Sequence, residues 1–167
     1  MASRPMRTLC GRLLLGLCLM SAPLAAATAG PASDLIEGMA EQAIQTLAET
    51  EGKLAEREAR LRTLLAQGFD MEHIARFALG RYWKRATEEQ RQDYVQAFSD
   101  YVVATYARRF GGYAGEKLQI EMERAAGPND VLVSTRIERR GNPSIVADWR
   151  VRVDDEPTRV IDVVVEG

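Results

Sequence analysis

The sequence predicts an α+β domain in which helices pack on one face of a four-stranded antiparallel sheet. Apolar residues recur every three or four positions up to about residue 110, which is typical of amphipathic helices. After Gly115 the apolar period changes to two, which indicates strands with one buried face. Only short turns separate these strands, so neighbours are expected to pair antiparallel. A run of helices followed by a run of strands favours segregated layers.

Two helices are expected first. Asp34 precedes an apolar stripe that runs to Leu47, and Glu37 three residues later completes a capping-box pattern. A second helix covers residues 53–67 and is expected to end at Gly68. Its outer face carries acid–base pairs at i, i+4 spacing, each worth a few tenths of a kcal/mol. These pairs are Glu56 with Arg60 and Glu58 with Arg62.

A short helix and a long helix follow. Asp70 is placed to cap a helix that ends at Leu79, where Gly80 supplies the stop. Thr87 and Gln90 form a second capping box, and the helix behind it extends to about residue 110. One stripe of the long helix is rich in aromatic residues: Tyr94, Phe98, Tyr101, Val102, Thr105 and Tyr106.

Four strands are expected after the long helix. In the first strand, Leu118, Ile120 and Met122 alternate with polar residues and are therefore expected to share one face. Combinations of Gly, Pro, Asn and Asp mark the three turns that follow. The other strands are expected over residues 131–139, 145–153 and 159–166.

Residues 1–29 have the order of a secretory signal peptide: three arginines, a short apolar run, then small residues. The apolar run is shorter than the roughly 20 residues that span a bilayer. Cleavage is expected after Ala27 or Ala29. Both cysteines lie in this segment, and the mature domain, residues 30–167, carries a net charge of about −5. An acidic domain is unsuited to nucleic acid, whose affinity rests on cationic contacts to phosphate.

The mature sequence offers no set of catalytic or metal-binding side chains. His73 is the only histidine, and no cysteine remains to pair with it. A metal site needs several ligands, which one histidine with scattered carboxylates does not supply. The glycines of residues 111–117 lack the spacing and the following Ser or Thr of a phosphate-binding loop. We therefore expect no catalytic residues, no metal and no cofactor.

Two motifs, in this order, resemble those of the MlaC family. They are Phe69-Asp70, Leu79-Gly80, Trp83 and Thr87 with Gln90 before the long helix, and Asp162-Val163 with Glu166-Gly167 at the end. MlaC-like proteins are periplasmic phospholipid-binding proteins, also called toluene-tolerance auxiliary proteins of an ABC transport system. Family members differ in the turn at 155–159, and their pattern continues beyond residue 167. The resemblance therefore leaves three alternatives for this chain: a truncated form that lacks a C-terminal segment, a deviant member of the family, or the product of a partial gene.

The resemblance implies a carrier that shuttles phospholipid between the outer and inner membranes and maintains outer-membrane lipid asymmetry. The expected partners are the phospholipid cargo, an inner-membrane ABC transporter complex and an outer-membrane lipoprotein complex of the Mla type. The resemblance also implies a curved sheet with an apolar cavity between it and the helices. Two acyl tails have on the order of 30 methylenes at about 0.8 kcal/mol each, so roughly 24 kcal/mol opposes their exposure to water.

Candidate contact residues come from the apolar faces of the predicted elements. The expected lipid-pocket residues are Trp83, Phe98, Tyr101, Val102, Tyr106, Trp149 and Val151. Three cations near the end of the long helix are candidates for the lipid head group: Arg108, Arg109 and Lys117. The alternative for these cations is that they complement the dipole at the helix C-terminus.

Three alternative functions are compatible with the same sequence. A hopanoid-associated member of the family would bind a rigid polycyclic lipid in the same cavity. A small periplasmic enzyme would need His73 or an acid such as Asp148 to point into the pocket with a shifted pKa. An adaptor without a ligand would have a solid core and an exposed apolar patch.

Overall fold

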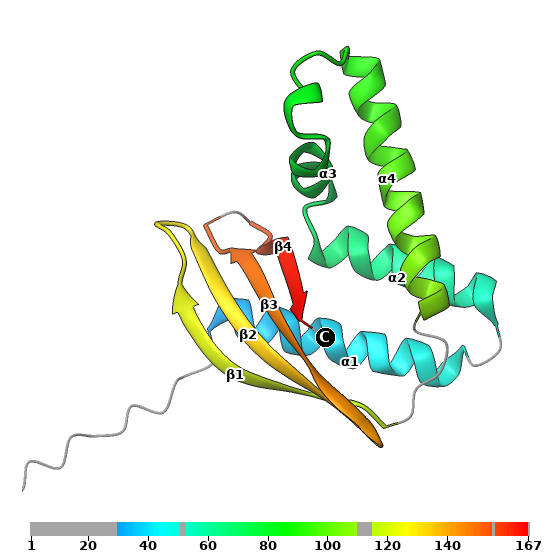
Figure 1. Cartoon of the computed structure of the whole chain (residues 1–167), viewed down its shortest axis with the longest axis vertical. Coiled ribbons are helices and arrows are strands. Elements are labelled where there is room, and N and C mark those ends of the chain that lie inside the picture. The colour runs from blue at the N-terminus through cyan, green and yellow to red at the C-terminus, as the bar shows by residue number, and fades with distance from the viewer. Residues whose placement is uncertain (1–29, 51–52, 110–114, 155, 167) are drawn as a thin grey trace, which may run out of the picture.

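The computed structural model describes residues 30–50, 53–109, 115–154 and 156–166. The expected signal peptide, residues 1–29, lies outside the described residues. Helices come first and strands second, as predicted (Figure 1). The helices are α1 (Pro31–Glu49), α2 (Leu54–Gly68), α3 (Met71–Leu79), the 3-10 helix η1 (Gly80–Tyr82) and α4 (Glu88–Arg109). The strands are β1 (Lys117–Ala125), β2 (Asp130–Arg139), β3 (Asn142–Arg152) and β4 (Arg159–Glu166).

The four strands form one antiparallel sheet in the order β1-β2-β3-β4, which confirms the predicted meander. Helix α1 lies across one face of this sheet (Figure 1). Its apolar stripe packs against three strands, and the buried core consists of Ala32, Ile36, Met39, Val133, Val151 and Val160. This core joins the first described helix to the last strand.

The other helices are arranged differently from α1. Helix α2 lies beside α1, and α3 and α4 form a hairpin that extends away from the sheet (Figure 1). The main contacts of α4 are with α2 and α3, and its fully buried side chains are Val103 and Ala107. The long helix is therefore held by other helices, and α3 and α2 connect the hairpin to β4.

Two of the predicted helix starts are confirmed. The Asp70 carboxylate accepts a hydrogen bond from the His73 backbone N–H at 2.9 Å at the start of α3. Thr87 and Gln90 make both reciprocal bonds of a capping box before α4, at 3.0 and 3.2 Å. The predicted stop at Gly80 is also confirmed, because this residue caps α3 with a φ of +56°, which favours glycine.

The prediction that Asp34 caps the first helix is wrong. Helix α1 begins one turn earlier, with Gly30 at the N-cap and Pro31 in the first turn. Proline is favoured there because its ring fixes φ and its missing N–H has no helical partner in any case. Gly68 is not a stop either, since α2 includes it and Phe69 is the C-cap. Its role is close packing: a Cβ at Gly68 would lie 2.1 Å from the Met39 sulfur.

The predicted i, i+4 pairs on α2 are replaced by contacts between helices. Arg60 pairs with Glu49 of α1, and Arg62 pairs with Asp100 of α4. Hydrogen bonds from Gln96 and Arg62 hold the pKa of Asp100 below its ordinary value. These arginines find carboxylates on neighbouring helices, which the sequence of one helix cannot reveal.

Arg57 is a buried cation that joins three helices. Only 7% of this residue is exposed. Its Nη1 donates to the Ala107 carbonyl at 3.1 Å, and its Nη2 donates to the Thr50 carbonyl at 3.1 Å. The two acceptors lie at the C-terminal ends of α4 and α1, where backbone carbonyls lack helical partners and carry partial negative charge. Among the described residues, the buried Nε has no hydrogen-bond partner.

The prediction that Met122 shares a face with Leu118 and Ile120 is wrong. The β1–β2 register shifts between Ile120 and Met122, so that Ile120 lies opposite Thr135 and Met122 lies opposite Ser134. Such an irregularity moves the following side chains to the other face of the sheet. Met122 is accordingly 48% exposed, whereas Leu118 and Ile120 pack against the core.

On the face opposite α1, Asp130 lies between two arginines. Its carboxylate accepts hydrogen bonds from Arg150 Nε at 2.9 Å and Arg152 Nε at 3.1 Å. Burial alone would raise the pKa of Asp130, but the hydrogen bonds and charges of Arg152 and Arg150 outweigh it. The pKa is therefore held below its ordinary value.

This arrangement predicts a pH-dependent contribution to stability. Because the pKa of Asp130 is lower in the folded state than in the unfolded state, its contribution is present above about pH 4 and is lost as the pH falls through the folded pKa. We expect Asp130→Asn to lower the free energy of unfolding by about 2 kcal/mol at pH 7. The difference from the parent should shrink markedly at pH 3. Urea denaturation at both pH values measures this, and an unchanged difference would contradict it.

Candidate functional site

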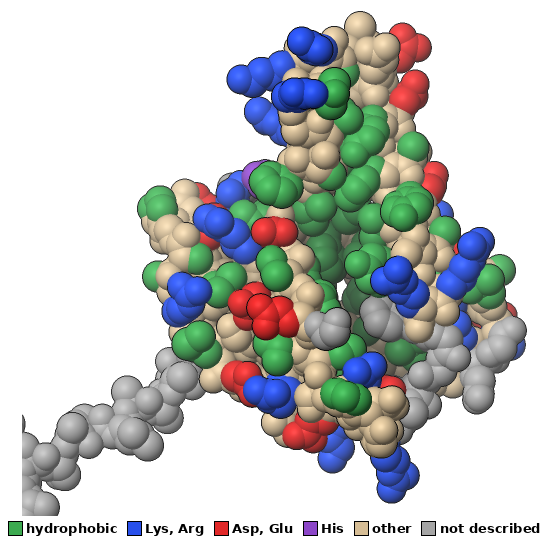
Figure 2. All heavy atoms as spheres, in the orientation of Figure 1, with side chains coloured by type: hydrophobic (Ala, Val, Ile, Leu, Met, Phe, Trp, Pro, Cys, Tyr) green, Lys and Arg blue, Asp and Glu red, His purple; other side chains and the backbone are tan. Residues whose placement is uncertain are grey.

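The main cavity lies where α2, α3 and α4 meet the β3–β4 turn and the start of β4. It has a volume of about 540 Å³. Figure 2 shows apolar side chains gathered in the hollow between the sheet and the helices. The residues that line the cavity are Arg62, Leu65, Ala66, Phe69, Asp70, Met71, Glu72, Gln96, Ser99, Val103, Glu156, Pro157 and Arg159.

The corner between α2 and α3 forms the middle of this cavity, and β4 fixes that corner. Phe69 forms an isolated parallel bridge with Val160, in which the Asp70 N–H donates to the Val160 carbonyl at 2.9 Å. Arg159 Nη1 donates to the carbonyls of Ala66 at 3.0 Å and Phe69 at 3.2 Å. This guanidinium satisfies the exposed carbonyls at the end of α2. The corner is therefore a rigid part of the wall.

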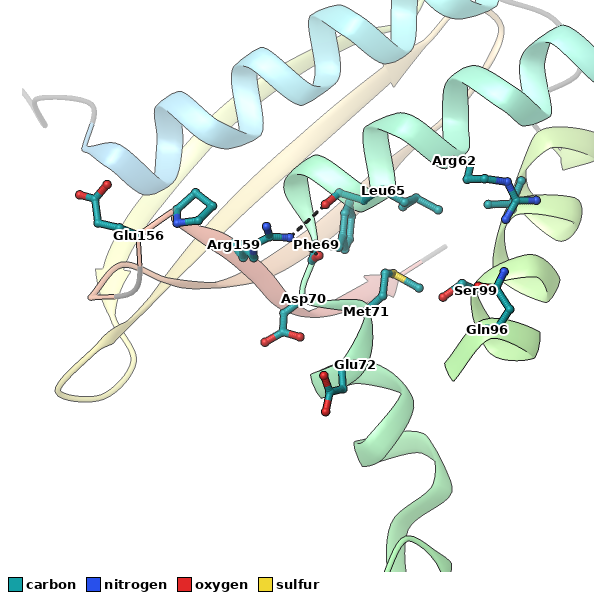
Figure 3. A pocket seen from close by; sticks show the side chains of 13 residues that line it. Arg62, Leu65, Phe69, Asp70, Met71, Glu72, Gln96, Ser99, Glu156 and Arg159 are labelled. Carbon is teal, nitrogen blue, oxygen red and sulfur yellow. Dashed lines mark hydrogen bonds between the residues drawn. The ribbon is translucent and has the colours of Figure 1, made fainter. Parts of the chain in front are cut away.

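The cavity has polar ends and a middle in which apolar and charged side chains mix. Leu65, Phe69 and Met71 lie between the two ends in the close-up view, and so do Asp70 and Arg159 (Figure 3). Arg62, Gln96 and Ser99 gather at one end, and Glu156 lies at the other (Figure 3). Such a site suits a ligand that combines hydrocarbon with polar groups.

One face of α4 lines the cavity. Gln96, Ser99 and Val103 recur at i, i+3 and i+7 and therefore share a face of the helix. The predicted aromatic stripe lies on another face, where Tyr94 and Phe98 contact each other with ring centroids 6.0 Å apart.

The expected lipid-pocket residues are spread over three regions. Trp83 follows η1 at the far end of the α3–α4 hairpin, and Val151 is fully buried in the core beneath α1. Trp149 is half-buried beside the cavity, since its ring meets that of Phe69 edge-on with centroids 6.4 Å apart. On α4, Phe98 and Val102 are half-buried, whereas Tyr101 is 69% and Tyr106 is 41% exposed. None of the seven residues is among those that line the cavity.

The three head-group candidates are exposed. Arg108 and Arg109 are in the last turn of α4, and Lys117 is the first residue of β1. The segment between them, residues 110–114, lies outside the described residues. The cations that do line the cavity are Arg62 and Arg159.

Sequence reasoning missed the residues that line the cavity, although a signal for some of them was present. Phe69, Asp70 and Met71 open the first family-like motif, where Asp70 was interpreted only as a cap. Ser99 and Val103 gave no signal, because the face they share is not distinguished by hydrophobicity. Arg62 is exposed, as predicted for the solvated face of α2, but its pairing with Asp100 and its place in the cavity wall depend on the position of α4.

The described residues contain no group of three or more His, Cys, Asp or Glu side chains placed to hold a metal ion. His73 is half-buried in α3 and does not line the cavity. Asp148, the other candidate acid, does not line the cavity either. It lies in β3, opposite Ser134 of β2 and Val164 of β4. Within the same residues, we find no helix with the length and apolar character needed to cross a membrane.

The described residues form an α+β fold of four α-helices and four strands, with a cavity at the junction of helices and sheet. Residues 37–167 match the family described as MlaC protein. This match covers most of the sequence, and the chain belongs to the MlaC family.

A curated relative and a solved structure are similar to the chain. The intermembrane phospholipid transport system binding protein MlaC of Haemophilus influenzae is 24% identical over 102 residues, which is 59% of this chain. The chain spans about half of that relative, since the match covers 48% of its length. The phospholipid-binding protein from Ralstonia solanacearum, solved with a phospholipid, has a TM-score of 0.72 and 22% identity, over 80% of this chain and 77% of that one. This likeness confirms the predicted fold class.

Proposed function

We propose that this chain is a phospholipid carrier of the periplasm. The cavity of about 540 Å³ is the observation that carries this proposal, because both apolar and polar side chains line it. Its volume falls within the roughly 300–1,000 Å³ range of small-molecule sites. Membership of the MlaC family and the phospholipid-binding names of the relatives support the same cargo.

The cavity residues suggest how the cargo is held. Leu65, Phe69, Met71 and Val103 provide the apolar contacts for acyl chains. We propose that five of the expected pocket residues, Phe98, Tyr101, Val102, Tyr106 and Trp149, add apolar surface where the tails extend beyond these contacts. The other two lie away from the cavity, since Val151 is fully buried in the core beneath α1 and Trp83 is at the far end of the α3–α4 hairpin. Arg108, Arg109 and Lys117 are proposed to meet the phosphate, for which their exposure and charge are suitable.

The biological role follows from the energetics. Free diffusion of a phospholipid through water is opposed by roughly 24 kcal/mol for two tails, so a carrier that replaces the bilayer's apolar surroundings speeds transfer without any chemical step. We propose that the chain exchanges lipid with an inner-membrane ABC transporter complex and an outer-membrane lipoprotein complex. This exchange would maintain the lipid asymmetry of the outer membrane. The carrier needs no catalytic residue for this role.

Solvent extraction of the purified protein, followed by mass spectrometry, tests the cargo. We expect phospholipid at close to one molecule per protein, because burial of two tails makes spontaneous loss slow. Detection of a hopanoid instead of phospholipid would identify a hopanoid as the cargo. An extract without lipid, from protein that also takes up none from phospholipid vesicles, would contradict the proposed function.

A further inference from the structure

The far end of the α3–α4 hairpin has an unusual composition. From residue 74 to residue 87 the chain contains no acidic residue, although the whole chain has a formal net charge of −2. Four basic and three aromatic residues lie in this stretch, which we call the hairpin tip: Arg76, Phe77, Arg81, Tyr82, Trp83, Lys84 and Arg85.

Two of the three aromatic side chains of the hairpin tip are exposed to solvent, and Trp83 is half-buried. Phe77 is 77% exposed and Tyr82 is 50% exposed. Phe77 is the most exposed of the large apolar residues among the described part of the chain. Because exposing apolar area to water is unfavourable, an exposed phenylalanine and an exposed tyrosine at the same end of the hairpin favour a contact surface.

The charges of the hairpin tip are available for an external partner. Arg76, Arg81, Lys84 and Arg85 are exposed, and none of them takes part in a salt bridge among the described residues. Figure 2 shows basic side chains gathered on one side of this end of the hairpin and acidic ones on the other. The acidic residues of the first turn of α4 are Glu88 and Glu89. The basic side is therefore a distinct surface.

This surface is held in a fixed shape. Arg91 Nε of α4 donates to the Trp83 carbonyl at 3.0 Å, and its guanidinium lies 5.4 Å from the Trp83 ring centroid. Arg81 donates to the Tyr82 hydroxyl at 3.0 Å and lies 5.0 Å from that ring. Preformed cation–aromatic contacts reduce the ordering that a docking event would require.

We propose that the hairpin tip docks the protein on an anionic phospholipid surface. Clustered Lys and Arg side chains are attracted to anionic head groups. Phenylalanine contributes apolar area that enters the interface, and tyrosine and tryptophan are favoured at the head-group level. Cations that form no salt bridge, together with exposed aromatic rings, match an anionic lipid interface, where the charges meet the head groups and Phe77 enters the apolar region. The tip is remote from the cavity, so docking and cargo binding are separate properties (Figure 1).

Co-sedimentation with vesicles tests this surface. In low salt, the purified protein should pellet with vesicles of 60% phosphatidylcholine and 40% phosphatidylglycerol, and at least tenfold less with pure phosphatidylcholine. Arg81→Glu with Arg85→Glu should lower binding to the anionic vesicles at least tenfold, because two attractive charges become repulsive. Phe77→Ser should lower it about fivefold, because apolar area is lost from the interface.

A matched charge control separates docking from net charge. Arg124→Glu with Arg140→Glu makes the same change at exposed positions on β1 and in the β2–β3 turn, and binding should stay within twofold of the parent. Circular dichroism and melting curves should show all variants folded. Failure of the parent to bind the anionic vesicles, or equal loss in both double variants, would overturn the proposal. Lipid content measured by extraction should not change in any of them, so this result is independent of the cargo test.

Discussion

Replacing Ser99 with tryptophan is expected to lower the affinity of the protein for phospholipid about tenfold. Ser99 is half-buried on the face of α4 that lines the cavity, and its hydroxyl donates only to the Val95 carbonyl of its own helix. An indole at this position occupies space that hydrocarbon would fill. If it displaces two methylenes, at about 0.8 kcal/mol each, the affinity falls by about tenfold. Competition between the variant and the parent for a limiting amount of phospholipid, followed by extraction and mass spectrometry of each protein, measures the change.

Two control variants make this result specific. Ser99→Ala removes the hydroxyl without adding volume and should keep the lipid content of the parent. Ala97→Trp places the same ring at an exposed position on the same helix that does not line the cavity, and it should also leave the lipid content unchanged. If Ser99→Trp competed for lipid as well as the parent while remaining folded, the cavity would not be the tail site.

Replacing Arg57 with methionine is expected to destabilise the fold by about 3 kcal/mol. Methionine fills most of the same space but donates no hydrogen bond, so the carbonyls of Ala107 and Thr50 lose their donors. Each buried acceptor left without a partner costs about 1–3 kcal/mol. For a domain of this size the melting temperature should fall by roughly 10 °C. Urea denaturation monitored by circular dichroism gives the free energy directly.

The control for this variant is Arg60→Met, one turn further along α2. Arg60 pairs with Glu49 at the surface, and exposed ion pairs are worth about 0–1 kcal/mol. Arg60→Met should therefore lower the free energy of unfolding by no more than about 1 kcal/mol. Equal destabilisation by both substitutions would show that the burial of Arg57 is unimportant.

Local signals in the sequence predicted the elements and several of their ends. The change of apolar period near Gly115 correctly separated helices from strands, because it reports which side chains share a face. The caps at Asp70 and Thr87 were predictable because a cap involves residues only three apart. The meander was predictable because short turns leave few other ways to connect strands.

Features that depend on distant parts of the chain were not predictable. The direction of α4 is set by its packing on α2 and α3, so the face of α4 that lines the cavity did not follow from its tyrosines. Arg57 has no distinguishing local pattern, and its burial appears only when the ends of α1 and α4 converge on it. The register shift that turns Met122 outward is a property of the β1–β2 pair, not of either strand alone.

The core beneath α1 has a consequence for biosynthesis. Ile36 and Met39 are among the first described residues, yet their partner Val160 lies in the last strand. During translation, the amphipathic stripe of α1 is therefore made long before the surface that covers it. A nascent chain that ends before β4 cannot complete this core. The apolar face of α1 then stays accessible to chaperones that recognise apolar segments. Final docking of α1 onto the sheet therefore has to wait until β4 has been made.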